Sequence, residues 1–216
     1  MKLLQSLQRR LRPTPPVDDT RWVVLDVESS GLNPKSDRLL AIAAIAVTNA
    51  GPQAHIRLGD SFEVVLRQDV LVADKANILL HGIGVGAQSQ GMAPDLALTA
   101  FESFIGNSPL IAFHAAFDQT LILRAFDTVL GRRPANPWLD LEPLAAVLMP
   151  KVRARSLDEW MATLQIRCAV RHQAAADTLA TAELLLKLWI PLRAELPRLD
   201  FGAVQALAEH RRWLPG

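Results

Sequence analysis

Three strand-like runs follow one another early in the chain, separated only by turn-length connections. The run Trp22–Val27 is rich in β-branched residues, Leu39–Val47 is continuously apolar, and His55–Leu66 alternates between polar and apolar residues. Runs of this kind predict β-strands, and their short connections predict that neighbouring strands pair antiparallel. A turn cluster, Ser29–Pro34, separates the first two runs. This stretch constrains the fold most, because it commits the first part of the chain to an antiparallel meander.

The rest of the chain alternates helical patterns with one short strand. Helices are expected over residues 95–105, 118–130, 156–164, 175–196 and 202–212, and a strand over residues 110–113. Gly131 is placed to end the second helix, while Ser156 and Glu159 have the spacing of a capping box. We therefore predict an α/β fold with a mixed sheet of about five strands, the first three antiparallel, and helices packed around it.

The length of 216 residues indicates one main domain with short extensions, since a domain averages roughly 150 residues. We place a basic amphipathic extension at residues 1–20, the main domain at 21–196 and a short helical tail at 197–216. The extension carries Lys2, Arg9, Arg10 and Arg12 without an acidic residue before residue 18. It is interpreted as a helix packed on the body or a frayed terminus, with a basic arm that contacts nucleic acid or a partner as the alternative.

Charge and cysteine content exclude several classes of protein. A net charge of +1 excludes a polycation that holds nucleic acid by charge alone, but not an enzyme with a locally basic groove. The single cysteine, Cys168, excludes an internal disulfide and a zinc ribbon. No apolar stretch reaches the length of about 18 residues that spans a membrane. We expect a protein of a reducing, cytoplasmic compartment without a membrane or a disulfide partner.

Four acidic residues occupy the ends of predicted elements. Asp26 and Glu28 are one residue apart at the end of the first strand, so both side chains point to one face. Asp118 begins a helix after the short strand, and Asp177 lies in the first turns of the long helix. Four converging carboxylates would raise one another's pKa values unless cations neutralised them. Carboxylate oxygens suit Mg²⁺ or Mn²⁺, and two such ions suit in-line attack on a phosphodiester.

His172 lies five residues before Asp177 and is the candidate general base of such a site. Each residue taken singly has a simpler interpretation. Asp26 and Glu28 could form a polar strand end, Asp118 could be an ordinary early-helix acid, and His172 could be a solvated loop histidine. The order and spacing of all five together favour a hydrolytic site.

The combined pattern resembles the DEDDh 3′–5′ exonucleases, and most closely bacterial proteins of the DNA polymerase III epsilon type. The similar segments are Val24–Leu32, Phe113–Asp118, Arg171–Asp177 with Ala180–Glu183, Leu80–Ile83 and Trp138–Leu141. The resemblance extends from about Arg21 to Leu192. It implies a ribonuclease H-like fold and hydrolysis from the 3′ end of single-stranded or frayed DNA, which releases nucleoside 5′-monophosphates.

The resemblance also implies roles for individual residues. Asp26, Glu28 and Asp177 would hold two Mg²⁺ or Mn²⁺ ions, Asp118 would assist at the second ion, and His172 would be the general base. The residues implied near the 3′-terminal nucleotide are Ser29, Ser30, Gly31, Leu32, His81, His114 and Phe117. Two departures stand out. Phe113-His114 occupies places where many relatives have His-Asn, and two serines replace the usual threonines after the glutamate.

Three alternatives stay open from the sequence. An exonuclease of the same fold could prefer RNA or short oligonucleotides, because no motif fixes a contact to the 2′-hydroxyl. A binding or docking module without catalysis is the alternative of another class. A polymerase or another replication protein is a candidate partner, although a stand-alone or accessory exonuclease is favoured over a core replisome subunit.

Overall fold

The protein is described from a computed structural model covering residues 16–49, 53–71, 74–196 and 198–210. Most of the predicted N-terminal extension, residues 1–15, lies outside the described residues, as do residues 211–216 of the predicted tail. The division into extension, domain and tail therefore stays a prediction.

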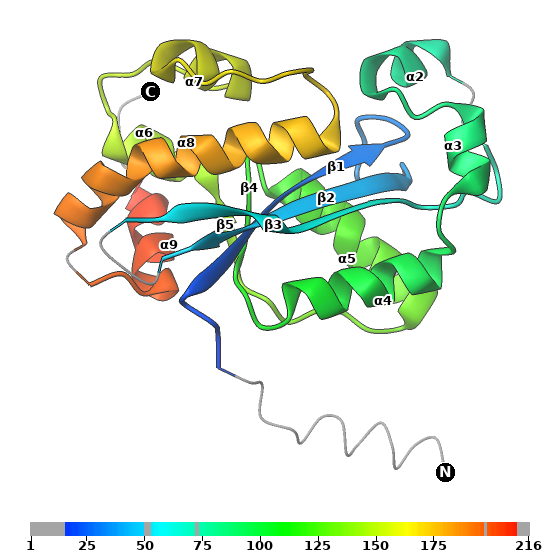
Figure 1. Cartoon of the computed structure of the whole chain (residues 1–216), viewed down its shortest axis with the longest axis horizontal. Helices are drawn as coiled ribbons and strands as arrows, with labels where there is room; N and C mark the ends of the chain where they lie inside the picture. The colour runs from blue at the N-terminus through cyan, green and yellow to red at the C-terminus, as the bar shows by residue number, and fades with distance from the viewer. Residues whose placement is uncertain (1–15, 50–52, 72–73, 197, 211–216) are drawn as a thin grey trace.

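Five strands form one mixed sheet with the order β3-β2-β1-β4-β5. In chain order they are β1 (Arg21–Ser29), β2 (Leu39–Thr48), β3 (His55–Val65), β4 (Leu110–Ala112) and β5 (Trp138–Asp140). The first three strands pair antiparallel, whereas β4 runs parallel to β1 and β5 runs parallel to β4. This confirms the predicted fold class, with β1 at the centre of the sheet (Figure 1).

Helices cover both faces of the sheet (Figure 1). They are α2 (Lys75–His81), α3 (Val85–Gln90), α4 (Pro94–Ile105), α5 (Ala116–Leu130), α6 (Leu141–Leu148), α7 (Leu157–Leu164), α8 (Ala174–Glu195) and α9 (Phe201–Glu209). One apolar core joins the sheet to α6, α7, α8 and α9, and a second joins the opposite face to α4 and α5. Strands β1, β2 and β4 are therefore largely buried between the helices, whereas most residues of the edge strand β3 are exposed or half-buried.

Local rules explain where several helices begin and end. Gly131 adopts φ 63° after α5, in the left-handed region that an L side chain rarely enters. Ser156 and Glu159 form the predicted capping box at the start of α7. Among the described residues, no helix is both long and apolar enough to cross a membrane.

The long helix α8 is fixed against β1 and β2 at both of its ends. Near its C-terminal end, Trp189 packs edge-on against Trp22 of β1, with ring centroids 5.4 Å apart. Near its N-terminal end, the buried Thr178 hydroxyl donates to the Ala43 carbonyl oxygen of β2 at 3.2 Å. These contacts set the first turn of α8 over the end of β1 (Figure 1).

Candidate active site

The central strand β1 delivers two carboxylates to the face covered by α8. Trp22 and Val24 belong to the core beneath α8, whereas Val23 and Leu25 belong to the core beneath α4 and α5. Because strand side chains alternate between faces, Asp26 and Glu28 continue the series of Trp22 and Val24. Both carboxylates therefore face α8, as their i, i+2 spacing predicts.

The first turn of α8 brings Asp177 to these two residues. Asp26 pairs with Ala43 in the β1–β2 register, and the Ala43 carbonyl accepts the hydrogen bond from Thr178. Asp177 precedes Thr178 and is only 6% exposed. Its negative charge raises the pKa values of both Asp26 and Glu28, which places the three carboxylates in one electrostatic cluster.

Asp118 reaches the same cluster from the other face of the sheet. Since β4 is parallel to β1, the carboxyl ends of both strands lie at one edge, and α5 starts shortly after β4. Asp118, in the first turn of α5, is 4% exposed. Burial raises the pKa of Asp118 to about 8, and the negative charges of Asp140 and Glu28 raise it further. Hydrogen bonds from the backbone N–H groups of Asp118 and Val27 act in the opposite direction and lower it.

Three of the carboxylates, those of Asp26, Glu28 and Asp118, have raised pKa values. Burial is the main cause that raises the pKa of Glu28 to about 8, and Asp177 adds to it. Burial also raises the pKa of Asp26, with further contributions from Asp118, Glu28 and Asp177. The donor set therefore fits a hard divalent cation, which takes oxygen ligands and would neutralise this cluster.

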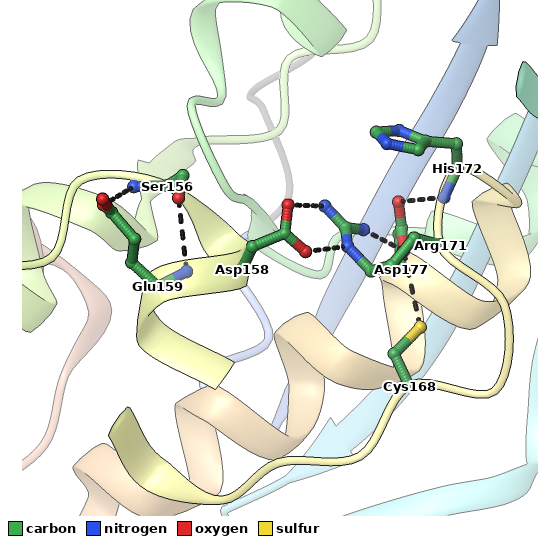
Figure 2. Close-up of polar contacts among 7 residues, drawn as sticks. All are labelled: Ser156, Asp158, Glu159, Cys168, Arg171, His172 and Asp177. Atoms are coloured by element: carbon green, nitrogen blue, oxygen red, sulfur yellow. Dashed lines mark hydrogen bonds and ion pairs between the residues drawn. The ribbon is translucent and has the colours of Figure 1, made fainter. Parts of the chain in front are cut away.

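The arrangement of the side chains does not form a closed cation cage. Within the part of the chain that the structure describes, no group of three or more His, Cys, Asp or Glu residues is arranged to hold a metal ion. Both oxygens of Asp177 have partners inside the protein. Oδ1 forms an ion pair with Arg171 and lies 3.6 Å from the Cys168 sulfur, while Oδ2 accepts from the His172 backbone N–H at 3.1 Å (Figure 2).

The raised pKa values predict how the metal-free protein responds to pH. Between about pH 4.5 and 8, folded Glu28 holds a proton that the unfolded chain has released, so stability falls as pH rises. In chelator, we expect the melting temperature to drop by about 5 °C or more between pH 6.5 and 8. Burial lowers the pKa of His81, so its titration makes stability rise with pH. This effect falls below the range from pH 6.5 to 8 and does not offset the expected drop.

Differential scanning fluorimetry at fixed ionic strength measures this dependence. Adding Mn²⁺ at pH 8 should recover the lost melting temperature, and Glu28→Gln should flatten the profile because it removes one of the titrating groups. A melting temperature that stays constant or rises between pH 6.5 and 8 would contradict the proposed clustering of carboxylates.

The candidate base, His172, lies in the loop between α7 and α8. Its backbone adopts φ 60°, an uncommon left-handed conformation for a residue other than glycine. The backbone N–H, rather than the ring, contacts Asp177, and the side chain is exposed. This contact fixes the position of His172 relative to Asp177 and leaves the ring accessible from solvent.

The turn after β1 presents Leu32 to solvent. The Ser29 hydroxyl donates to the Gly31 carbonyl at 2.6 Å, and the Ser30 hydroxyl accepts from the Arg38 N–H at 2.9 Å. A Cβ on Gly31 would lie 2.6 Å from the Asp37 carboxylate, so a larger residue here would have to displace the Asp37 side chain. The two serine hydroxyls therefore brace the turn, while Leu32 is 91% exposed. Their contacts with a nucleotide stay predictions.

Helix α2 brings His81 to the same edge of the sheet. The Asn77 side chain donates to the Ser29 carbonyl at 3.0 Å, which ties α2 to the turn after β1. The Ile83 N–H donates to His81 Nδ1 at 3.0 Å, so a neutral His81 carries its proton on Nε2. Nε2 is buried and has no hydrogen-bond partner among the described residues. This leaves an N–H donor for a ligand.

His114 and Phe117 differ in their accessibility. His114 is exposed, with φ 58°, and its backbone N–H donates to Asp140 Oδ1 at 3.0 Å. Phe117 is half-buried and packs against the core beneath α4 and α5. Their predicted contacts with a substrate are untested.

Two charged groups at the site were not among the predicted site residues. Asp140 is the last residue of β5 and the N-cap of α6, and its carboxylate accepts from the His114 backbone N–H. Its negative charge also adds to the raised pKa of Asp118. Arg171 connects Asp177 to Asp158 of α7. The sequence offered one indication for Asp140. Acidic residues at the end of the predicted first strand were already site candidates, and Asp140 is a further acidic residue of this kind. The sequence offered none for the pairing of Arg171.

Comparison with known proteins identifies a matching family. Residues 23–185 match the model of the RNase_T family, which is described as "Exonuclease". A DNA polymerase III subunit epsilon-like protein of Rhodobacter capsulatus is 32% identical over 192 residues, which is 88% of this chain and 26% of that protein. A PolC-type DNA polymerase III of Clostridium perfringens is 31% identical over 196 residues, 88% of this chain and 12% of the polymerase. The chain thus spans about a quarter or less of these two relatives.

Solved structures share the fold at lower sequence identity. E. coli Exonuclease I in complex with a dT13 oligonucleotide superposes with a TM-score of 0.67 at 18% identity, covering 82% of this chain and 43% of that one. Exonuclease X in complex with 5′ overhanging duplex DNA gives a TM-score of 0.65 at 16% identity, covering 87% of this chain and 99% of that one.

Proposed function

The chain belongs to the RNase_T exonuclease family, and on that premise we propose that it is a metal-dependent 3′–5′ exonuclease that acts on DNA. The observation that carries the proposal is the convergence of Asp26, Glu28, Asp118 and Asp177 at the carboxyl ends of β1 and β4 and the start of α8. Buried or half-buried carboxylates at one place would repel a phosphate that lies beside them unless cations are bound there.

The carboxylates are assigned by their positions. Asp26, Glu28 and Asp177 would hold two Mg²⁺ or Mn²⁺ ions, and Asp118 would contribute at the second ion. Bound divalent ions supply charge neutralisation for the phosphate and activation of the attacking water. Burial of Asp118 and Asp177 excludes water from these carboxylates and therefore strengthens their interaction with a cation.

His172 is proposed as the general base. Its backbone is held beside Asp177, and its exposed ring can accept the proton of a water molecule that attacks phosphorus. When the bond between phosphorus and the 3′ oxygen of the penultimate nucleotide breaks, this oxygen takes a proton from solvent and becomes the new 3′-hydroxyl, and a nucleoside 5′-monophosphate is released. His172 returns its proton to solvent.

The edge of the sheet around the carboxylates suits a frayed or single-stranded 3′ end. Leu32, which is exposed, is proposed to pack against a terminal base, and the unpartnered His81 Nε2–H is proposed to donate to the terminal nucleotide. Ser29, Ser30, Gly31, His114 and Phe117 are proposed to complete this contact surface. RNA is the alternative substrate.

The relatives' names provide the basis for a proposed partner. Two relatives of which this chain covers only a part are named for bacterial DNA polymerase III. We propose a replication polymerase as a candidate partner in the cytoplasm, with the chain acting as a stand-alone or accessory exonuclease.

A gel assay tests the activity directly. Single-stranded DNA and RNA of equal sequence, labelled at the 3′ or the 5′ end, are incubated with Mg²⁺, with Mn²⁺ or with chelator. We expect metal-dependent shortening from the 3′ end of DNA, with release of 5′-monophosphates on thin-layer chromatography. Shortening of RNA alone would reassign the substrate, and intact polymers under all conditions would favour a binding or docking module.

A further inference from the structure

Arg171 lies between two carboxylates that belong to different helices (Figure 2). Its Nε donates to Asp158 Oδ1 of α7 at 2.5 Å, and its Nη1 forms an ion pair with Asp177 Oδ1 of α8. The Arg171 side chain is 25% exposed, compared with 60% for Asp158 and 8% for Asp177. One guanidinium thus joins an exposed carboxylate to a buried one.

This pairing conflicts with the binding of a divalent cation at Asp177. The Arg171 guanidinium lies against Asp177 Oδ1, so a cation that binds this oxygen meets a like charge beside it. Arg171 also acts on the rest of the cluster, because its charge lowers the pKa values of Asp26 and Glu28 against the opposing effect of burial. The guanidinium therefore supplies positive charge to the carboxylate cluster.

We propose that Arg171 is a displaceable counter-cation that occupies Asp177 in the metal-free protein and withdraws to Asp158 when a divalent ion binds. The inference rests on the proposed metal site. Asp158 makes the withdrawal feasible, because Arg171 keeps a paired carboxylate after it leaves Asp177. Arg171 is therefore a positioning residue, and it sets the metal affinity of the site through Asp177.

Opposite effects of Arg171 and Asp158 variants follow from this arrangement. Arg171→Gln removes the competing charge and should bind Mn²⁺ about tenfold more tightly, a change equivalent to about 1.4 kcal/mol. Asp158→Asn removes the alternative partner of Arg171, so Arg171 stays on Asp177. Mn²⁺ should then bind about 3-fold more weakly or worse. The double variant should match Arg171→Gln, because Asp158 acts through Arg171. Arg171→Lys keeps the charge and should remain near the wild type.

Isothermal titration of the full-length, chelator-treated protein with Mn²⁺ measures these affinities without substrate. Arg133→Gln is the matched control, because it removes a guanidinium from an Arg–Asp pair at the far end of α5. The melting temperature in chelator gives a second readout. Arg171→Gln should lower it and should gain more from Mn²⁺ than the wild type does.

Separate outcomes distinguish the two proposals. If the wild type fails to bind Mn²⁺, or if Asp177→Asn binds it as well as the wild type, the metal site and the role of Arg171 are both wrong. If the wild type binds Mn²⁺ through Asp177 but Arg171→Gln binds it equally or more weakly, only the role of Arg171 is overturned. Equal affinities of Asp158→Asn and wild type would overturn it as well.

Discussion

Asp177→Asn should abolish 3′-terminal nucleotide release, with a rate reduced by about 10³-fold or more in Mg²⁺ or Mn²⁺. Asp177 is buried in the first turn of α8, and its charge acts on both Asp26 and Glu28. The next residue, Thr178, donates to Ala43 of β2, so the fold sets the position of Asp177. Asparagine keeps the size of the side chain but removes the negative charge that binds a divalent ion.

The variant should otherwise remain folded and able to bind DNA. The amide oxygen of asparagine can still accept from the His172 N–H, so the loop before α8 keeps this anchor. Affinity for fluorescently labelled single-stranded DNA in chelator, measured by anisotropy, should therefore stay close to that of the wild type. Asp95→Asn is the matched control, since Asp95 is an exposed acid in the first turn of α4. Full nuclease activity of Asp177→Asn would remove the metal assignment.

Periodicity and spacing were sufficient to predict the framework of the site. The apolar runs placed β1 and β2, and the i, i+2 spacing of Asp26 and Glu28 placed both on one face, which the structure shows to be the face toward α8. The capping box of Ser156 and Glu159 was readable because it depends on residues three apart. These features are local, so the sequence contains all the information that they need.

Features that depend on tertiary packing were not predicted. Helices α2 and α3 have seven and six residues and lie among glycines, so neither contains a long amphipathic pattern. Strand β5 has only three residues, and its pairing with β4 places Asp140. Arg171 and Asp158 are 13 residues apart and meet because α7 packs against α8. No spacing rule relates two such residues, and the charge balance of the site was therefore visible only in the fold.

His172→Asn should lower the rate of nucleotide release by about 10²–10⁴-fold, the usual contribution of a general base, while Mn²⁺ affinity stays nearly unchanged. Asparagine suits the φ of 60° at this position better than most residues do, and its backbone N–H can still donate to Asp177. The substitution thus removes the imidazole and leaves the anchor of the loop. Single-turnover rates on 3′-labelled single-stranded DNA measure the effect.

Chemical rescue separates the loss of a base from the loss of structure at His172. Added imidazole should restore part of the rate to a His172→Gly variant, because glycine tolerates a positive φ and opens space where the ring had been. It should restore nothing to Asp177→Asn, whose defect is a missing carboxylate. His55→Asn is the matched control, since His55 is an exposed histidine at the start of β3. A His172→Asn enzyme with nearly wild-type turnover would show that another group, or solvent itself, takes the proton from the attacking water.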